Sequence, residues 1–127
     1  MEQALRYGLI QAIPELNNQI YPTNAPEGAE GPYLVYTRIN TNKIKTLEGL
    51  TGKEYLGFMF SVMATKYKDM KFLTKKVENF LVSLPGTQIG SYCIEDIDIN
   101  NVHEQYEHEL KVNRGIIDFT IYFEEVR

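Results

Sequence analysis

The run from Gly31 to Tyr67 constrains the fold most, because it holds two apolar segments joined by a long polar stretch. The first segment, Tyr33–Asn40, is rich in aromatic and β-branched residues, and the second, about Glu54–Thr65, alternates apolar side chains on one face. Both patterns predict strands. The stretch between them, roughly Thr41–Lys53, is much longer than the roughly two to five residues that usually close a hairpin. Connections of that length are usually functional or disordered, so we expect a polar hairpin arm that contacts another molecule.

Helical periodicity predicts one helix before this hairpin and one after it. At the N-terminus, apolar residues recur at helical spacing until Pro14, which lacks a backbone donor, so the regular helix should end near Ile13. After the second strand, an apolar stripe with lysines on the outer side predicts another helix, which Pro85–Gly86 ends. Residues 22–32 are rich in proline and glycine and predict a loop, and Asn17–Tyr21 before it could form a short strand.

The C-terminal third of the chain predicts two more strands. Isoleucines alternate with acids over Gln88–Ile99, which suits a short, irregular strand. The segment of about Tyr106–Glu125 predicts a long strand whose odd-numbered apolar residues share one face. These elements make a single α+β domain over residues 1–127. We expect an antiparallel (mixed) β-sheet with two α-helices packed on one face and a long polar β-hairpin arm.

Composition agrees with one folded domain. The chain has 127 residues, 43% hydrophobic and 24% charged, which is enough to bury a core without metals or disulfides. Cys93 is the single cysteine, so no intrachain disulfide is possible and nothing points to secretion. No stretch approaches the roughly 18 apolar residues of a membrane span. We therefore expect a soluble protein, made in a reducing cytoplasm, with no membrane partner.

Charge is distributed unevenly along the chain. Residues 41–80 carry a net charge of +4, with eight lysines, whereas residues 81–127 carry −6. A protein with one basic and one acidic region can attract copies of itself head to tail. Ordinary solvated surface of each sign is the alternative, and charge alone leaves both interpretations open.

Residues that could carry catalytic or metal chemistry are sparse. The two histidines, His103 and His108, would point to opposite faces of a strand, and on a helix they would lie about 140° apart. They should not converge on a metal ion. The sequence places no histidine near Cys93, and the glycines at Gly49–Gly52 lack the strand-to-helix setting of a phosphate loop. We predict no enzyme activity, no cofactor and no metal site.

Nucleic-acid binding is another class to consider. Lysines along the second helix form a basic flank, and Tyr55 and Tyr67 could stack on bases. However, no arginine lies in that cluster, the isoelectric point is about 5.2, and no groove-reading motif is visible. Lysines are ordinary on the outer side of a helix, so sequence-specific binding is not expected.

Short motifs follow one another along nearly the whole chain. The first strand begins Pro-Tyr-Leu-Val-Tyr at Pro32–Tyr36, and a leucine-acid-glycine turn follows at Leu47–Gly49. The second strand passes through Thr65–Tyr67 into the lysine-rich helix. An acidic segment, Glu104–Glu109, precedes an aromatic strand end at Phe119–Glu125. This order resembles the tail-completion (tail terminator) proteins of long-tailed bacteriophages, although the tryptophan that the family often carries near the end of the second strand is absent.

The resemblance implies a structural role in a virion. Such proteins form a ring, usually hexameric, at the head-proximal end of the tail tube, where they end tube polymerisation and join the tail to the head connector. The implied partners are further copies of the chain, the tail-tube protein and head-tail connector proteins. DNA passes through the axial channel without specific binding.

Charge and position suggest which residues would serve this role. The arm and the basic flank are expected to contact a neighbouring subunit or the tube, through Lys43, Lys45, Leu47, Glu48, Lys53, Lys71 and Lys75. The channel must let DNA pass without binding it, so we expect acidic side chains to line it: Glu104, Glu107 and Glu109. Two alternatives stay open: a portal-side head-tail connector adaptor, and a small monomeric binding module.

Overall fold

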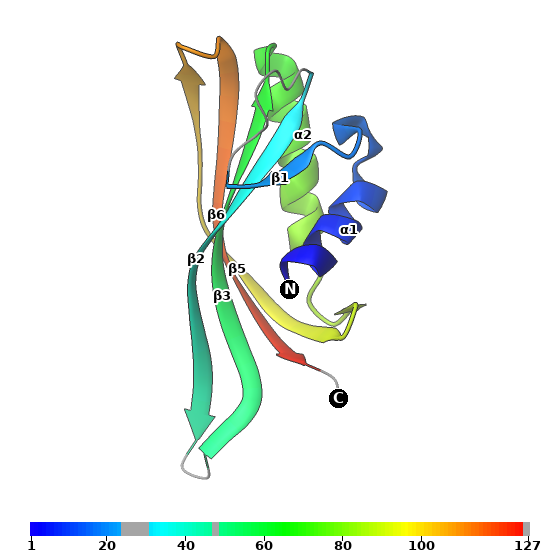
Figure 1. Ribbon diagram of the computed structural model, residues 1–127, viewed down its shortest axis with the longest axis vertical. Helices are drawn as coiled ribbons and strands as arrows, with labels where there is room; N and C mark the ends of the chain where they lie inside the picture. Colours follow the sequence, from blue (N-terminus) through cyan, green and yellow to red (C-terminus); the bar gives the residue numbers. More distant parts are fainter. Residues whose placement is uncertain (24–30, 47–48, 126–127) are drawn as a thin grey trace.

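A computed structural model describes the backbone of residues 1–23, 31–46 and 49–125, and the side chains of these residues except 40–46 and 49–52. Its frame is one six-stranded sheet that curls around two helices lying on the same face (Figure 1). The predicted α+β architecture is therefore confirmed. In chain order the elements are α1 (Glu2–Ala12), the 3-10 turn η1 (Pro14–Leu16), β1 (Ile20–Pro22), β2 (Tyr33–Thr46), β3 (Gly49–Ala64), α2 (Tyr67–Val82), β4 (Gln88–Ile89), β5 (Tyr92–Glu107) and β6 (Val112–Glu125).

The sheet is mixed and is built around four long strands. Its strand order is β1-β2-β3-β6-β5-β4. The short β1 runs parallel to β2, and every other neighbouring pair is antiparallel. Both predicted helices are present, and α1 ends beside Pro14 for the reason that the sequence suggested, since proline cannot continue the backbone hydrogen bonding of the helix.

The hairpin arm is a continuation of β2 and β3. Pairing between these strands runs on to Thr46↔Gly49, whereas the pairing of β3 with β6 ends at Lys53↔Glu124. The hairpin therefore extends past the sheet as a two-stranded ribbon, at the bottom of Figure 1. The second strand begins at Gly49 rather than near Glu54, so the predicted boundary was wrong. The polar sequence of this stretch has no apolar alternation, so nothing in it indicated a strand.

The division of the C-terminal third into strands was also wrong. A strand ending at Ile99 and a long strand starting near Tyr106 were predicted, but β5 runs unbroken from Tyr92 to Glu107. The turn lies at residues 108–111, and β6 follows. The second half of β5 carries exposed polar side chains and pairs with β6 through its backbone. Its side chains therefore carry no hydrophobic signal of strand structure.

The core lies between the helices and one face of the sheet. Phe58 and Phe60 of β3 meet Phe119 of β6, with ring centroids 5.6 Å and 4.7 Å from that of Phe119. All three side chains are buried, which confirms the predicted apolar faces of both strands. The apolar stripes of the two helices complete this core through Leu5, Leu9, Leu73, Val77 and Leu81.

Gly115 of β6 allows α2 to pack directly on the sheet. A Cβ atom at this position would overlap Thr74 Oγ1 and lie 2.9 Å from Met70 Sδ.

We expect Gly115→Ala to lower the free energy of unfolding by about 1–3 kcal/mol, because the helix must shift or repack. Urea denaturation measures this loss. Thr74→Ala removes part of the overlap. The double variant should therefore lose less unfolding free energy than the sum of the losses in the two single variants. A Gly115→Ala protein as stable as the parent would contradict this packing.

Candidate assembly surfaces

The basic flank of α2 is tied to the sheet by a small polar cluster. The Tyr67 hydroxyl donates a hydrogen bond of 2.9 Å to Glu104 on β5, and Lys71 Nζ lies 3.8 Å from the same carboxylate. Lys71 also donates to the Tyr67 oxygen at 3.3 Å, and this bond, with the charge of Glu104, raises the pKa of Lys71. Lys75 Nζ lies 3.9 Å from a carboxylate oxygen of Glu78. Both predicted contact lysines therefore already have carboxylate neighbours within the subunit.

A groove lies beside this cluster, between α2 and β5. Its volume is about 760 Å³, and it is lined in part by Phe72 and Val102, which are 56% and 40% exposed. Lys68, Lys71 and Lys75 of the basic flank border it. The groove therefore presents apolar and cationic side chains together on the surface.

The arm candidates are only partly described. Lys43 and Lys45 lie on β2, with backbones paired to Glu54 and Leu50 of β3, but their side chains are outside the described part of the chain. Leu47 and Glu48 lie outside the described residues altogether. At the base of the arm, Lys53 Nζ lies 3.5 Å from Glu95 Oε1 on β5.

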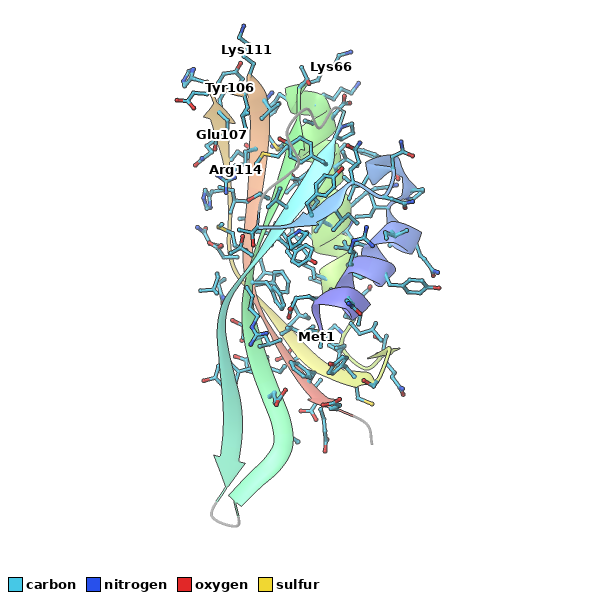
Figure 2. All side chains as sticks on the ribbon, in the orientation of Figure 1. Met1, Lys66, Tyr106, Glu107, Lys111 and Arg114 are labelled. Atoms are coloured by element: carbon cyan, nitrogen blue, oxygen red, sulfur yellow. The ribbon has the colours of Figure 1, made fainter. Side chains whose placement is uncertain are left out.

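The three predicted channel residues do not lie together. Glu104 points to the helix side of the sheet, where it meets α2. Glu107 contacts Arg114 on the opposite, helix-free face at 3.1 Å, and hydrogen bonds from Gln105 and Arg114 lower the pKa of Glu107. Glu109 is exposed in the turn between β5 and β6. Figure 2 shows Glu107 and Arg114 near the end of the molecule opposite the hairpin arm.

The helix-free face of the sheet carries carboxylates that the sequence analysis did not single out. The β5–β6 register sets Asp96 opposite Tyr122, Asp98 opposite Thr120, and Asn101 opposite Asp118. Cross-strand partners share a face, so these three aspartates lie on the face opposite the phenylalanine core. The pKa of Tyr122 is raised mainly by its hydrogen bond to Asp98 and, to a smaller extent, by desolvation of the hydroxyl. The available signal was the position of Asp98 and Asp118, each between two apolar residues of its strand, whereas Asp96 follows Glu95 and gave no such signal.

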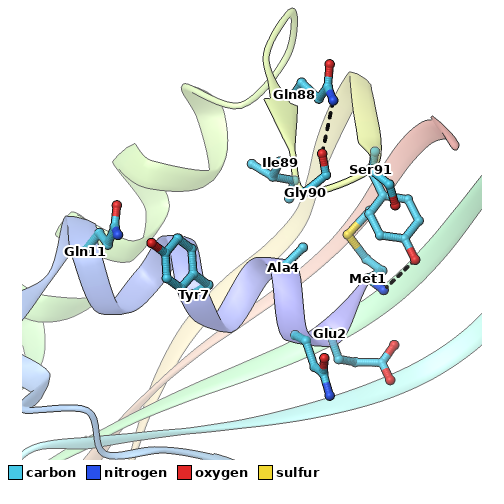
Figure 3. Close-up of a pocket in the computed structure, with 12 residues that line it drawn as sticks. Met1, Glu2, Ala4, Tyr7, Gln11, Gln88, Ile89, Gly90 and Ser91 are labelled. Atoms are coloured by element: carbon cyan, nitrogen blue, oxygen red, sulfur yellow. Dashed lines mark hydrogen bonds between the residues drawn. The ribbon is translucent and has the colours of Figure 1, made fainter. Parts of the chain in front are cut away.

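A second hollow lies where α1 approaches β4 (Figure 3). Its volume is about 830 Å³, and Tyr7, Gln11 and Gln88 are among its lining residues. The amino group of Met1 donates a 3.1 Å hydrogen bond to the Tyr92 hydroxyl beside it. Among the described residues, no three His, Cys, Asp or Glu side chains are grouped to hold a metal ion. None of the described helices is long and apolar enough to cross a membrane.

Comparison with known proteins identifies the fold. No family model matches this sequence, and no curated protein sequence matches it significantly. A chain of the solved structure "Virion of native gene transfer agent (GTA) particle" is similar with a TM-score of 0.71 and 14% identity, over 97% of this chain and 96% of that chain. Another solved structure is similar with a TM-score of 0.57 and 8% identity, over 100% of this chain and 96% of that one. At these identities, the likeness establishes a shared fold.

Proposed function

We propose that this chain is a structural virion protein that forms a ring at the head-proximal end of a phage tail. There it ends tail-tube polymerisation and joins the tail to the head connector. The observation that carries the proposal is the fold, which matches a chain of a gene transfer agent virion over nearly the full length of both chains. The order of sequence motifs, which resembles tail-completion proteins, supports the same role independently.

The hairpin arm supplies the contact with a neighbouring subunit or with the tube in this proposal. A ribbon of two strands is marginally stable on its own in water, so an arm that extends past the sheet is stabilised when it pairs with or packs on another protein. Its sequence carries Lys43, Lys45, Leu47 and Glu48, which offer both charged and apolar contacts. Lys71 and Lys75 would contribute through long-range attraction, since each already has a carboxylate neighbour.

The helix-free face is the better candidate for the channel lining. DNA carries a dense negative charge, so a lining of carboxylates repels it and lets it slide. Asp96, Asp98 and Asp118 share this face, whereas Glu104 is bound by α2 on the other one. Glu107 and Glu109 remain candidates for lining the channel at the end of the molecule that carries the β5–β6 turn. A portal-side connector adaptor is the second candidate function, because a virion chain with this fold could occupy either layer.

The mass of the purified protein tests the proposal. We expect the chain, mixed with the tail-tube protein of the same virus, to give a ring of about six copies, because a heterologous contact closes by rotation. Multi-angle light scattering, with and without the tube protein, measures it. A twelvefold ring that ignores the tube protein would favour the portal-side adaptor. A protein that stays a monomer in both samples would contradict a ring role and favour a binding module.

A further inference from the structure

The sheet has two long free edges. On the outer side of β2, β1 pairs only with Leu34–Tyr36, so residues 37–46 have no neighbouring strand among the described residues. On the outer side of β5, β4 pairs only with Tyr92–Cys93, and residues 95–107 have no neighbouring strand in the described chain. Long open edges offer backbone donors and acceptors to other strands, and monomeric proteins usually cover or shorten them.

Each edge carries charges of a single sign, and the signs of the two edges are opposite. Residues 37–46 hold Arg38, Lys43 and Lys45 and no acid, whereas residues 95–107 hold five acids and no lysine or arginine. Some of these charges have partners within the subunit, such as Arg38 with Glu2 at 3.4 Å. The pairs of Arg38 with Glu2 and of Lys53 with Glu95 are exposed and therefore weak. Glu107 is held more firmly by the less exposed Arg114, so the acidic charge that the β5 edge offers to a neighbour comes mainly from Glu95, Asp96 and Asp98.

Charge selects how two copies can meet. Pairing two β2 edges would set basic residues against basic residues, and pairing two β5 edges would set acids against acids. Both two-fold arrangements are therefore disfavoured. A β2 edge against a β5 edge brings opposite charges together, and this contact is heterologous, so it repeats around a ring.

Strand direction agrees with the same contact. The strands β2, β3, β6 and β5 alternate in direction, so β2 and β5 of one subunit run in opposite directions. Rotation about an axis roughly along the strands keeps these directions. The β2 edge of one subunit would then meet the β5 edge of the next as an antiparallel pair, and the ring would close without a mismatched junction.

We propose that the free edge of β2, residues 37–46, pairs with the free edge of β5, residues 95–107, of a second copy. The result is one closed antiparallel sheet to which every subunit contributes four long strands. This inference rests on the proposed ring function and adds the surfaces that make the ring. Backbone pairing supplies the affinity, and the opposed charges supply the direction and exclude two-fold dimers.

Complementation between two charge-reversed variants tests the pairing. The first variant, Lys43→Glu with Lys45→Glu, has an acidic β2 edge, and the second, with Glu95, Asp96 and Asp98 each changed to Lys, has a basic β5 edge. Like charges would then face each other at every junction, so we expect each variant alone to lose more than about tenfold of its assembled fraction. A one-to-one mixture restores opposite charges at every junction. We expect it to recover rings of alternating subunits, measured by light scattering.

The control reverses two lysines away from both edges. Lys66→Glu with Lys111→Glu changes the net charge as much as the first variant does, at the end of the molecule opposite the arm (Figure 2). We expect this control to assemble like the parent. Circular dichroism confirms that each variant is folded, so a lost assembly is not lost folding.

Amide hydrogen exchange is a second measurement, and it reports backbone pairing rather than attraction between charges. On assembly of the parent protein, amides within residues 37–46 and 95–107 should exchange more slowly, because they enter a ladder. Folded variants that fail to recover when mixed, or a parent ring without added protection at either edge, would overturn the pairing and leave the ring function standing. A parent protein that never assembles with the tube protein would overturn both.

Discussion

Replacing residues 44–53 with an Asn-Gly turn should abolish ring assembly with the tube protein and leave the domain folded. The turn would join Lys43 and Glu54, which are register partners on β2 and β3, and Asn-Gly suits a two-residue hairpin. Apart from Lys53, which pairs with Glu124 at the end of β6, the removed ribbon lies past the pairing of β3 with β6, so we expect the free energy of unfolding to change by less than about 1 kcal/mol. Light scattering with the tube protein measures assembly, and urea denaturation measures stability.

The matched control for this deletion is Lys53→Ala. Lys53 was among the predicted contact residues, but its charge is already paired with Glu95 within the subunit, so we expect it to contribute less to assembly than the ribbon. The substitution removes the ion pair with Glu95, 3.5 Å long, while it keeps the ribbon. Exposed ion pairs contribute about 0–1 kcal/mol, so this variant should be nearly as stable as the parent and should still assemble. If the trimmed protein formed the same ring as the parent, the arm would be an ordinary hairpin without a role in assembly.

The largest loss of stability is expected from Phe119→Ala. Phe119 is 1% exposed and lies at the centre of the aromatic cluster, stacked on Phe58 and edge-to-face with Phe60. Truncation removes these contacts and leaves a cavity, which costs about 3–5 kcal/mol for a buried phenylalanine. A domain of this size has only about 5–15 kcal/mol of stability, so a large part of it would be lost. The midpoint of urea unfolding measures the effect.

Phe72→Ala is the control for this substitution. Phe72 is 56% exposed on α2, so the same chemical change should alter the free energy of unfolding by about 0.5 kcal/mol or less. Equal losses for the two variants would contradict the placement of the core between the helices and β6.

Burial explains which elements were predictable from the sequence. The stripe of α2 and the alternating faces of β3 and β6 were predicted because these faces form the core, and burial requires apolar residues at the spacing of each element. The other face of the two strands is also buried in part, at Met63 and Ile116. Pro14 and Pro85 also indicated the helix ends through their missing backbone donors. The second half of β5 is exposed, so its side chains have no reason to alternate, and the arm is polar in sequence; the strand boundaries in both segments were missed.

The candidate surfaces were predictable only as regions of charge. The sequence indicated a basic middle and an acidic end, but it could not tell that Glu104 binds Tyr67 on one face while Glu107 binds Arg114 on the other. It also did not separate Asp98 and Asp118 from the other acids. Faces depend on the pairing register, and a shift of one residue moves every side chain to the opposite face.

The amino-acid sequence by itself determined the helices, the apolar faces of the strands and the separation of charge along the chain, because local periodicity and composition are enough for these. Tertiary structure decided the strand order, in which residues 37–46 of β2 and 95–107 of β5 have no outer neighbour among the described residues, and so it assigns one charge to each open edge. It also decided that the arm is a paired ribbon continuous with the sheet. Strand pairing joins residues far apart in the chain through backbone hydrogen bonds. Every residue offers a carbonyl acceptor and every residue except proline an N–H donor, so the sequence pattern alone does not record the pairing.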